Sequence, residues 1–160
     1  MKLIALVGPS NSGKTTTLKK LGDTLITECG TIKWLKKGKR IYNEEKELSS
    51  TQNLMSIPGD LHVKISYNDK LVYINTFGDD VDRVKNGFCS AHDCEIYVFA
   101  RHDTEQAEDL IEEFMRKNGI DTIYEVWKVG SMKKCENYPN FDKVTNCADC
   151  LAIQEILSQL

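Results

Sequence analysis

The run Leu3-Ile-Ala-Leu-Val7 and the segment that follows it, Gly8-Pro-Ser-Asn-Ser-Gly13-Lys14-Thr15, decide the fold of this 160-residue chain. A continuous apolar run predicts a strand that is covered on both faces, as in a parallel sheet. A helix is predicted over residues 14–28, because leucines recur there on one stripe, and Gly30 is expected to cap its end. The leucines are Leu18, Leu21 and Leu25. A strand, a glycine-rich turn and a helix in this order are typical of an α/β sheet.

The rest of the chain continues to alternate strands with helices. Apolar and polar side chains alternate over 61–65, and a second strand follows over 71–74 after the turn residues Asn68-Asp69, which predicts an antiparallel hairpin. Further strands are predicted over 31–35, 96–100 and 120–129, and further helices over 104–118 and 149–160. We interpret residues 1–160 as one domain, a three-layer α/β/α fold with a mostly parallel sheet and one antiparallel hairpin strand.

Two shorter assignments complete this pattern. Asp103 is expected to cap the helix over 104–118, with Gln106 completing a capping box. Residues 36–56 are polar, carry both charges and show no period, so they are predicted to form a long loop with at most a short helix. Five basic residues cluster at its start: Lys33, Lys36, Lys37, Lys39 and Arg40. This 36–56 loop is either a contact for a protein partner or a solvated loop.

Composition excludes several classes of protein. The chain has 24 acidic and 21 basic side chains, hence a formal charge of -3, and a dedicated nucleic-acid binder is usually strongly basic. A nucleic-acid partner is therefore not expected. No apolar run approaches the roughly 20 residues that a membrane helix requires, and Met1–Val7 does not resemble a signal peptide. We expect no membrane association and a cytoplasmic location.

The segment Gly8–Thr15 fits the pattern G-x-x-x-x-G-K-[ST] and resembles the Walker A motif of P-loop nucleoside triphosphatases. Glycines let the backbone curl so that N–H groups point at phosphate oxygens, and the start of the helix adds positive potential. Lys14 is expected to contact the β- and γ-phosphates of ATP or GTP, and the Thr15 hydroxyl to bind Mg²⁺. The expected phosphate-binding residues are Gly8, Ser10, Asn11, Ser12, Gly13, Lys14, Thr15 and Thr16.

A second segment, Ile74-Asn75-Thr76-Phe77-Gly78-Asp79-Asp80, resembles the D-T-x-G segment of Ras-like GTPases. In that family the aspartate holds Mg²⁺ through water, the glycine N–H senses the γ-phosphate, and the strand belongs to an antiparallel hairpin. The resemblance implies a metal role for Asn75, although an amide carries no charge and should bind Mg²⁺ more weakly, and a phosphate contact for Gly78. Asp79 stands where these enzymes keep a water-orienting glutamine and is expected to act as general base. The alternative is that Asp79-Asp80 caps the next helix.

The guanine-reading motif of Ras-like GTPases, N-K-x-D, is not matched. Residues 100–103 retain only its final aspartate, so the base preference stays open and the 130–134 segment is the candidate for contacting the base. Thr51 is the only threonine between Thr31 and Thr76, and the resemblance assigns it the metal-binding role of the first switch loop.

Six cysteines form two partial clusters, Cys89 and Cys94 with His92, and Cys147-Ala-Asp-Cys150, together with the isolated Cys29 and Cys135. A four-ligand zinc site assembled from the two clusters is one interpretation. The other, which we favour, is that these thiols pack in the core or are incidental.

These observations predict a P-loop nucleoside triphosphatase of Ras-like strand arrangement, in which Lys14 and Asp79 are catalytic and Thr15 and Asn75 hold Mg²⁺. Slow hydrolysis would control a conformational state. A small-molecule or nucleotide kinase is the first alternative, although the four arginines are scattered at Arg40, Arg83, Arg101 and Arg116. A nucleotide-binding module without hydrolysis is the second alternative, because Asn75 weakens the expected metal site.

Overall fold

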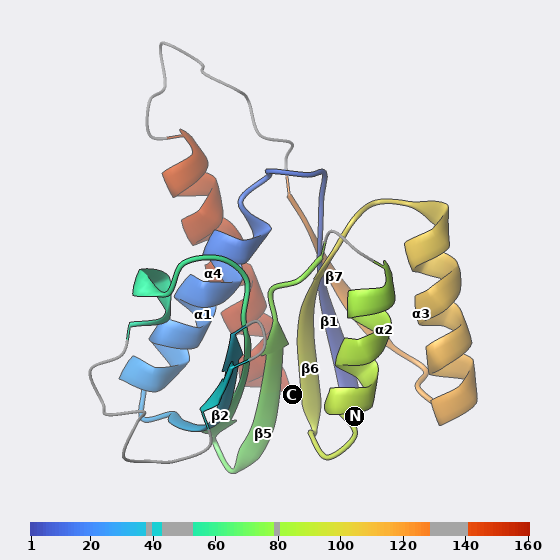
Figure 1. Ribbon diagram of the computed structural model, residues 1–160, viewed down its shortest axis with the longest axis horizontal. Coiled ribbons are helices and arrows are strands. Elements are labelled where there is room, and N and C mark those ends of the chain that lie inside the picture. Colours follow the sequence, from blue (N-terminus) through green and yellow to red (C-terminus); the bar gives the residue numbers. More distant parts are fainter. Residues whose placement is uncertain (38–39, 43–52, 79–80, 129–140) are drawn as a thin grey trace.

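A computed structural model of the chain describes residues 1–37, 40–42, 53–78, 81–128 and 141–160 (Figure 1). The described residues form a seven-stranded sheet and four α-helices. The strands are β1 (Lys2–Val7), β2 (Thr31–Lys37), β3 (Arg40–Tyr42), β4 (His62–Tyr67), β5 (Lys70–Asn75), β6 (Ile96–Arg101) and β7 (Ile123–Trp127). The helices are α1 (Lys14–Thr27), α2 (Val81–Ser90), α3 (Glu105–Asn118) and α4 (Phe141–Gln159), and a short 3-10 helix, η1, covers Leu54–Ser56.

The strand order is β3-β2-β4-β5-β6-β1-β7. Strands β5, β6, β1 and β7 pair in parallel, whereas β3, β2, β4 and β5 pair antiparallel in that order. The predicted α/β architecture with a mostly parallel sheet is confirmed. The prediction of one antiparallel hairpin strand is wrong, because β3 runs antiparallel to β2 and is a second such strand. The predicted loop over 36–56 is wrong at its start for the same reason, since charged residues there form an edge strand, where lysines are common.

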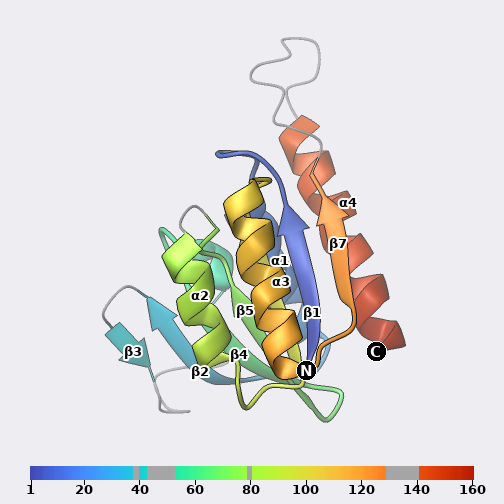
Figure 2. The ribbon, with the colours of Figure 1, turned by 90° about the vertical axis from the view of Figure 1, so that its right-hand side faces the viewer.

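Strand β1 lies inside the sheet and is buried on both faces, as its continuous apolar run predicts (Figure 2). Ile4 and Leu6 pack with residues of α1 and α4 on one face. Leu3, Ala5 and Val7 pack with residues of α2 and α3 on the other face. The helices therefore form two layers around the sheet. Among the described residues, no helix combines the length and apolarity that crossing a membrane requires.

The ends of two helices differ from the predictions. Thr104, not Asp103, is the N-cap of α3, and its hydroxyl accepts from the Ala107 N–H, the third N–H of the helix. At the end of α1, Cys29 rather than Gly30 adopts the left-handed conformation, with φ of 76°. Gly30 follows and donates its N–H to Leu25 O at 2.8 Å, which closes the last turn.

The sequence pattern does not clearly predict helix α2, and it predicts only the second half of helix α4. Helix α2 covers residues 81–90, to which the sequence analysis assigns no element beyond the alternative of a capped helix, and α4 begins at Phe141 rather than at residue 149. In α2 a glycine, Gly87, stands inside the helix and lowers its intrinsic propensity. A Cβ at that position would lie 2.0 Å from Tyr97 Oη, so the glycine is required by the close contact between α2 and the sheet.

The connections at β1 and β6 leave the sheet toward opposite faces. The chain passes from β1 into α1, and from β6 into α3, and these helices lie on different sides. Because β1 and β6 are neighbours, their carboxyl ends diverge and leave a crevice at that edge of the sheet. Ligands of open α/β sheets bind in crevices of this kind.

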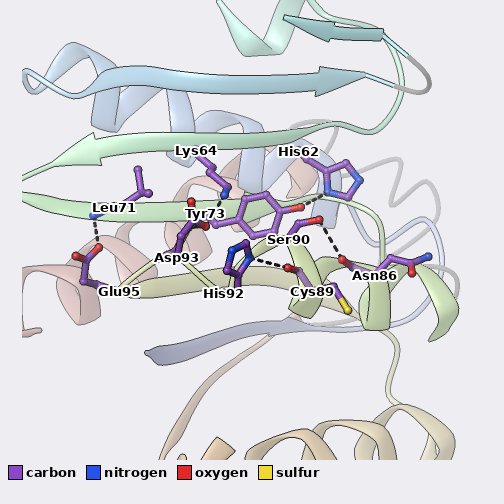
Figure 3. A network of polar contacts seen from close by, with 11 residues as sticks. His62, Lys64, Leu71, Tyr73, Asn86, Cys89, Ser90, His92, Asp93 and Glu95 are labelled. Carbon is purple, nitrogen blue, oxygen red and sulfur yellow. Dashed lines mark hydrogen bonds and ion pairs between the residues drawn. The ribbon is translucent and has the colours of Figure 1, made fainter. Parts of the chain in front are cut away.

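A partly buried histidine joins the antiparallel strands to this core. His62 Nδ1 lies 2.7 Å from Tyr73 Oη (Figure 3). The His62 ring also stacks on Phe77, with 4.6 Å between centroids. Beside them, Lys64 donates to Asp93 in the turn after α2. Burial, reinforced by the positive charge of Lys36, lowers the pKa of His62 to about 4.

This histidine should make stability depend on pH in a defined window. The unfolded chain takes up a proton on His62 below about pH 6.5 and the folded chain does so only near pH 4, so the free energy of unfolding should fall by up to about 3 kcal/mol as the pH decreases between these values. Urea titrations at stepped pH measure it. His62→Gln should remove most of this slope, whereas His92→Gln, at an exposed position, should retain it. An unchanged slope in His62→Gln would contradict the assignment.

Candidate active site

The loop between β1 and α1 curls around the start of the helix. Asn11 and Gly13 adopt left-handed conformations, with φ of 58° and 85°. Gly13 is the N-cap residue of α1 and has no side chain to accept from the first N–H groups of the helix. These N–H groups and the positive end of the helix dipole favour an anion at this position.

The first cavity of the site has a volume of about 250 Å³ and lies at this loop. It is lined by Asn11, Ser12, Gly13, Lys14, Thr15 and Thr76. Ser12 is 6% exposed, and within the described part of the chain no hydrogen-bond partner reaches its Oγ. Leaving a buried hydroxyl unsatisfied costs about 1–3 kcal/mol. A phosphate oxygen would satisfy it, so the residues present fit a bound phosphate.

Lys14 lies folded against its own loop. Its Nζ donates to Gly8 O at 2.8 Å and to Pro9 O at 2.7 Å, and the residue is 5% exposed. Backbone carbonyls are neutral acceptors, and a hydrogen bond to an anionic phosphate oxygen is stronger than one to a carbonyl. The ammonium is thus held beside the cavity by groups that a triphosphate can replace.

Asp60 joins this site, although the sequence analysis does not predict it. Its Oδ1 accepts from Thr15 Oγ1 at 2.7 Å and from Thr76 Oγ1 at 3.1 Å. One carboxylate therefore connects the start of α1 with the end of β5. Asp60 is the carboxylate that the structure brings to the predicted metal-binding threonine.

The segment before Asp60 is fixed on α1 by buried and half-buried polar contacts. Asp23 accepts from the Leu54 N–H at 2.6 Å, and Lys19 Nζ donates to Ile57 O at 2.5 Å. Gly22 allows Leu54 to approach, since a Cβ there would lie 2.5 Å from Leu54 Cδ1. Desolvation is the main cause that raises the pKa of Asp23 and lowers that of Lys19. These contacts determine where Asp60 lies.

Asn75 has a different environment from the one that its predicted metal role requires. Its side chain is fully buried, its Nδ2 donates to Tyr97 Oη at 2.9 Å and its Oδ1 accepts from the Phe77 N–H at 2.9 Å. It does not line the cavity, and β6 separates its strand from β1. Its contacts instead hold the turn that carries Thr76 and Gly78.

The other predicted site residues are only partly brought together. Ser10 and Thr16 are exposed, and neither lines the cavity. Gly8 begins the loop and donates its N–H to Arg101 O at 3.2 Å. Gly78 packs against Ala100, to which a Cβ would come within 2.7 Å. Three predicted contributors lie outside the described residues: Asp79, Thr51 and the 130–134 segment.

A buried polar network supports the loop from behind, and no motif in the sequence indicates it. Lys128, which follows β7, donates its Nζ to Asn146 Oδ1 at 2.7 Å and to Asp149 Oδ2 at 2.6 Å. Asn146 also accepts from Thr17 Oγ1 at 3.1 Å. A Cβ on Gly13 would lie 2.6 Å from Asn146 Oδ1, so this amide leaves room only for glycine. Helix α4 thereby helps to shape the Gly8–Thr15 loop.

The cysteines lie on different sides of the sheet. Cys150 packs with the α1 and α4 layer, and Cys94 with the α2 and α3 layer. Cys147 Sγ accepts from Lys20 Nζ at 2.6 Å. Within the described ranges, no three His, Cys, Asp or Glu residues form a group that could hold a metal ion. Cys135 lies outside those ranges.

Comparison of the chain with protein-family models, curated proteins and solved structures found no match.

Replacing Asn75 by aspartate tests the structural role of this residue. A carboxylate at a fully buried position loses hydration, and only its protonated form can donate to Tyr97 Oη. We expect Asn75→Asp to lower the free energy of unfolding at pH 7 by about 2 kcal/mol or more, and by less near pH 4, where the new carboxyl group is protonated more readily.

Urea unfolding at the two pH values measures this difference. Asn68→Asp, at an exposed turn position with φ of 49°, is the matched control and should change stability little. If Asn75→Asp is as stable as the parent chain at pH 7 and binds Mg²⁺ more tightly, the metal role implied by the resemblance is the better account.

Proposed function

We propose that this protein binds a nucleoside triphosphate together with Mg²⁺ at the Gly8–Thr15 loop and hydrolyses it slowly. The observation that carries this proposal is the buried Ser12 hydroxyl, for which no described residue is a hydrogen-bond partner, at the start of α1 and in the same cavity as Lys14. An unsatisfied donor, an ammonium group and the first N–H groups of a helix together favour a multiply charged anion. Triphosphate oxygens have this chemistry.

The oxygen donors beside the loop fit Mg²⁺. Mg²⁺ is usually held by one or two protein oxygens, waters and substrate phosphates, and Thr15 Oγ1 with the Asp60 carboxylate would supply the protein part. When bound, Mg²⁺ neutralises charge on the phosphates and polarises them. In this proposal Asp60 takes the role that the sequence analysis gives to Asn75.

The protein's own contribution is electrostatic and positional. Lys14 turns from the carbonyls of Gly8 and Pro9 to the phosphates, and Ser12 donates its hydroxyl to a phosphate oxygen. Of the six described residues that line the cavity, Lys14 is the one cation. Phosphoryl transfer without an arginine at the transferred group is typically slow, which favours low turnover. Asp79 as the group that orients water stays a prediction.

Asp60 also suggests how nucleotide binding could control a conformational state. It belongs to the segment over residues 53–60, which is attached to α1 by Lys19 and Asp23 and reaches the site from outside the loop. A ligand that binds Thr15 would alter its hydrogen bond to Asp60, and with it one of the contacts that position this segment. The base of the nucleotide is left open, and ATP and GTP are tested in parallel.

Lys14→Ala should weaken the binding of non-hydrolysable ATP and GTP analogues roughly 100-fold, because two or more charge-assisted hydrogen bonds are lost. The fold should remain, since Lys14 lines the cavity and is not part of either apolar core cluster. Calorimetric titration measures the affinity. Lys117→Ala, at an exposed position of α3, is the control. Unchanged affinity in folded Lys14→Ala would overturn the proposed phosphate site.

Asp60→Asn should raise the Mg²⁺ concentration needed for half-maximal nucleotide binding by about tenfold, because an amide holds metal-bound water more weakly than a carboxylate. Binding without Mg²⁺ should change much less. The readout is a magnesium titration at fixed nucleotide, with Asp69→Asn in the exposed hairpin turn as control. Equal magnesium dependence in Asp60→Asn and the parent chain would exclude Asp60 from the metal site.

A further inference from the structure

A second cavity, of about 240 Å³, lies at the same edge of the sheet, beyond the carboxyl ends of β5 and β6. It is lined by Gly78, Val81, Val84, His102, Thr104, Gln106 and Ala107. A molecule of the size of a small polyol or sugar alcohol fits such a space.

The second cavity lies close to the first cavity, because residues that line the two cavities are near each other in the sequence. Thr76 lines the first cavity and Gly78 lines the second one. The Cα atoms of these two residues are at most about 7.6 Å apart, because only one residue separates them in the sequence. On the other side, Arg101 O accepts from the Gly8 N–H at 3.2 Å, and His102 is the next residue. A molecule in the second cavity would therefore lie next to an anion bound in the first cavity.

Among the residues that the structure describes, the lining of the second cavity has no fixed charge. Val81, Val84 and Ala107 give it an apolar side, Thr104 and Gln106 give it hydrogen-bonding groups, and His102 is its one titratable residue. A charged ligand would find no ion partner among these residues, and its desolvation would be unfavourable. An uncharged molecule with hydroxyl groups matches both sides.

We propose that this cavity holds a small uncharged alcohol that accepts the γ-phosphoryl group, so that the protein is a small-molecule kinase and hydrolysis is its reaction with water in place of the alcohol. The proposal rests on the proposed triphosphate site. Arg101 donates to Glu125 at 2.7 Å and does not line either cavity, and an acceptor without charge needs no arginine to bind it.

The step balances without a further reactant. The alcohol oxygen forms a bond to the γ-phosphorus, and the bond from that phosphorus to the β,γ-bridging oxygen breaks, with its electron pair leaving on the nucleoside diphosphate. The hydroxyl proton passes to the imidazole of His102 and then to solvent. The products are a nucleoside diphosphate, a phosphate monoester and a proton.

The test uses the full chain with γ-labelled ATP and GTP and three uncharged probes of increasing size, glycerol, erythritol and myo-inositol. At least one of them should raise nucleoside diphosphate release by about tenfold over the reaction in water, with label recovered as a phosphate monoester. Gluconate, a charged polyol, should have no effect. If nucleotide binds but no probe produces a monoester, this inference is overturned and the triphosphate site stands. If no nucleotide binds, the proposed function and the inference both fail.

Two variants of lining residues test whether the alcohol binds in the second cavity. Gln106→Glu adds a charge at an exposed position of the lining, and Ala107→Leu fills space, so each should raise the KM for the alcohol by about tenfold. Gln159→Glu, an exposed substitution at the end of α4, is the matched control and should leave that KM unchanged. Unchanged KM in both folded lining variants would mean that the alcohol binds elsewhere and would overturn the assignment of the cavity.

Discussion

The hydrogen bond from Thr15 Oγ1 to Asp60 Oδ1 connects the parts of this molecule that matter for its proposed chemistry. Thr15 opens α1, Asp60 ends a segment that is fixed on the side of the same helix, and Thr76, which donates to the same oxygen, follows β5. The Asp60 carboxylate accepts hydrogen bonds from both hydroxyls at the edge of the sheet, so one charged group connects its own segment with α1 and with the end of β5. Moving any of these segments changes the cavity at the Gly8–Thr15 loop, because Thr15 and Thr76 both line it.

Much of the fold could be predicted because its signals are local. The apolar run of β1, the glycine-rich turn and the leucine stripe of α1 are contiguous, and the hairpin of β4 and β5 has its turn residues between them. Other elements depend on tertiary contacts. Gly87 opposes helix formation in α2, but the close packing on Tyr97 requires it, and the charged residues of β2 and β3 show no period that distinguishes an edge strand from a loop.

The site was predictable where a motif is contiguous and not where the fold assembles it. Residues 8–15 have the expected strand and helix on either side, and the loop geometry follows from Gly13. Asp60 has no neighbour in sequence that marks it, because it meets Thr15 only when the 53–60 segment lies along α1. The resemblance at Asn75 placed the metal role on a residue whose amide must both donate to Tyr97 and accept from Phe77, which a carboxylate cannot do.

The contact of Asn146 with Gly13 also bears on how the newly made chain matures on the ribosome. Thr17 and Asn146, which hydrogen bond beside this glycine, are 129 residues apart, and β1 itself pairs with β6 and β7. A nascent chain therefore presents its glycine-rich loop long before the strands and the helix that give the loop its shape have been synthesised. Contacts of such wide sequence separation favour slow, concerted folding. The Gly8–Thr15 loop should thus reach its final shape late in synthesis, after α4 has left the ribosome.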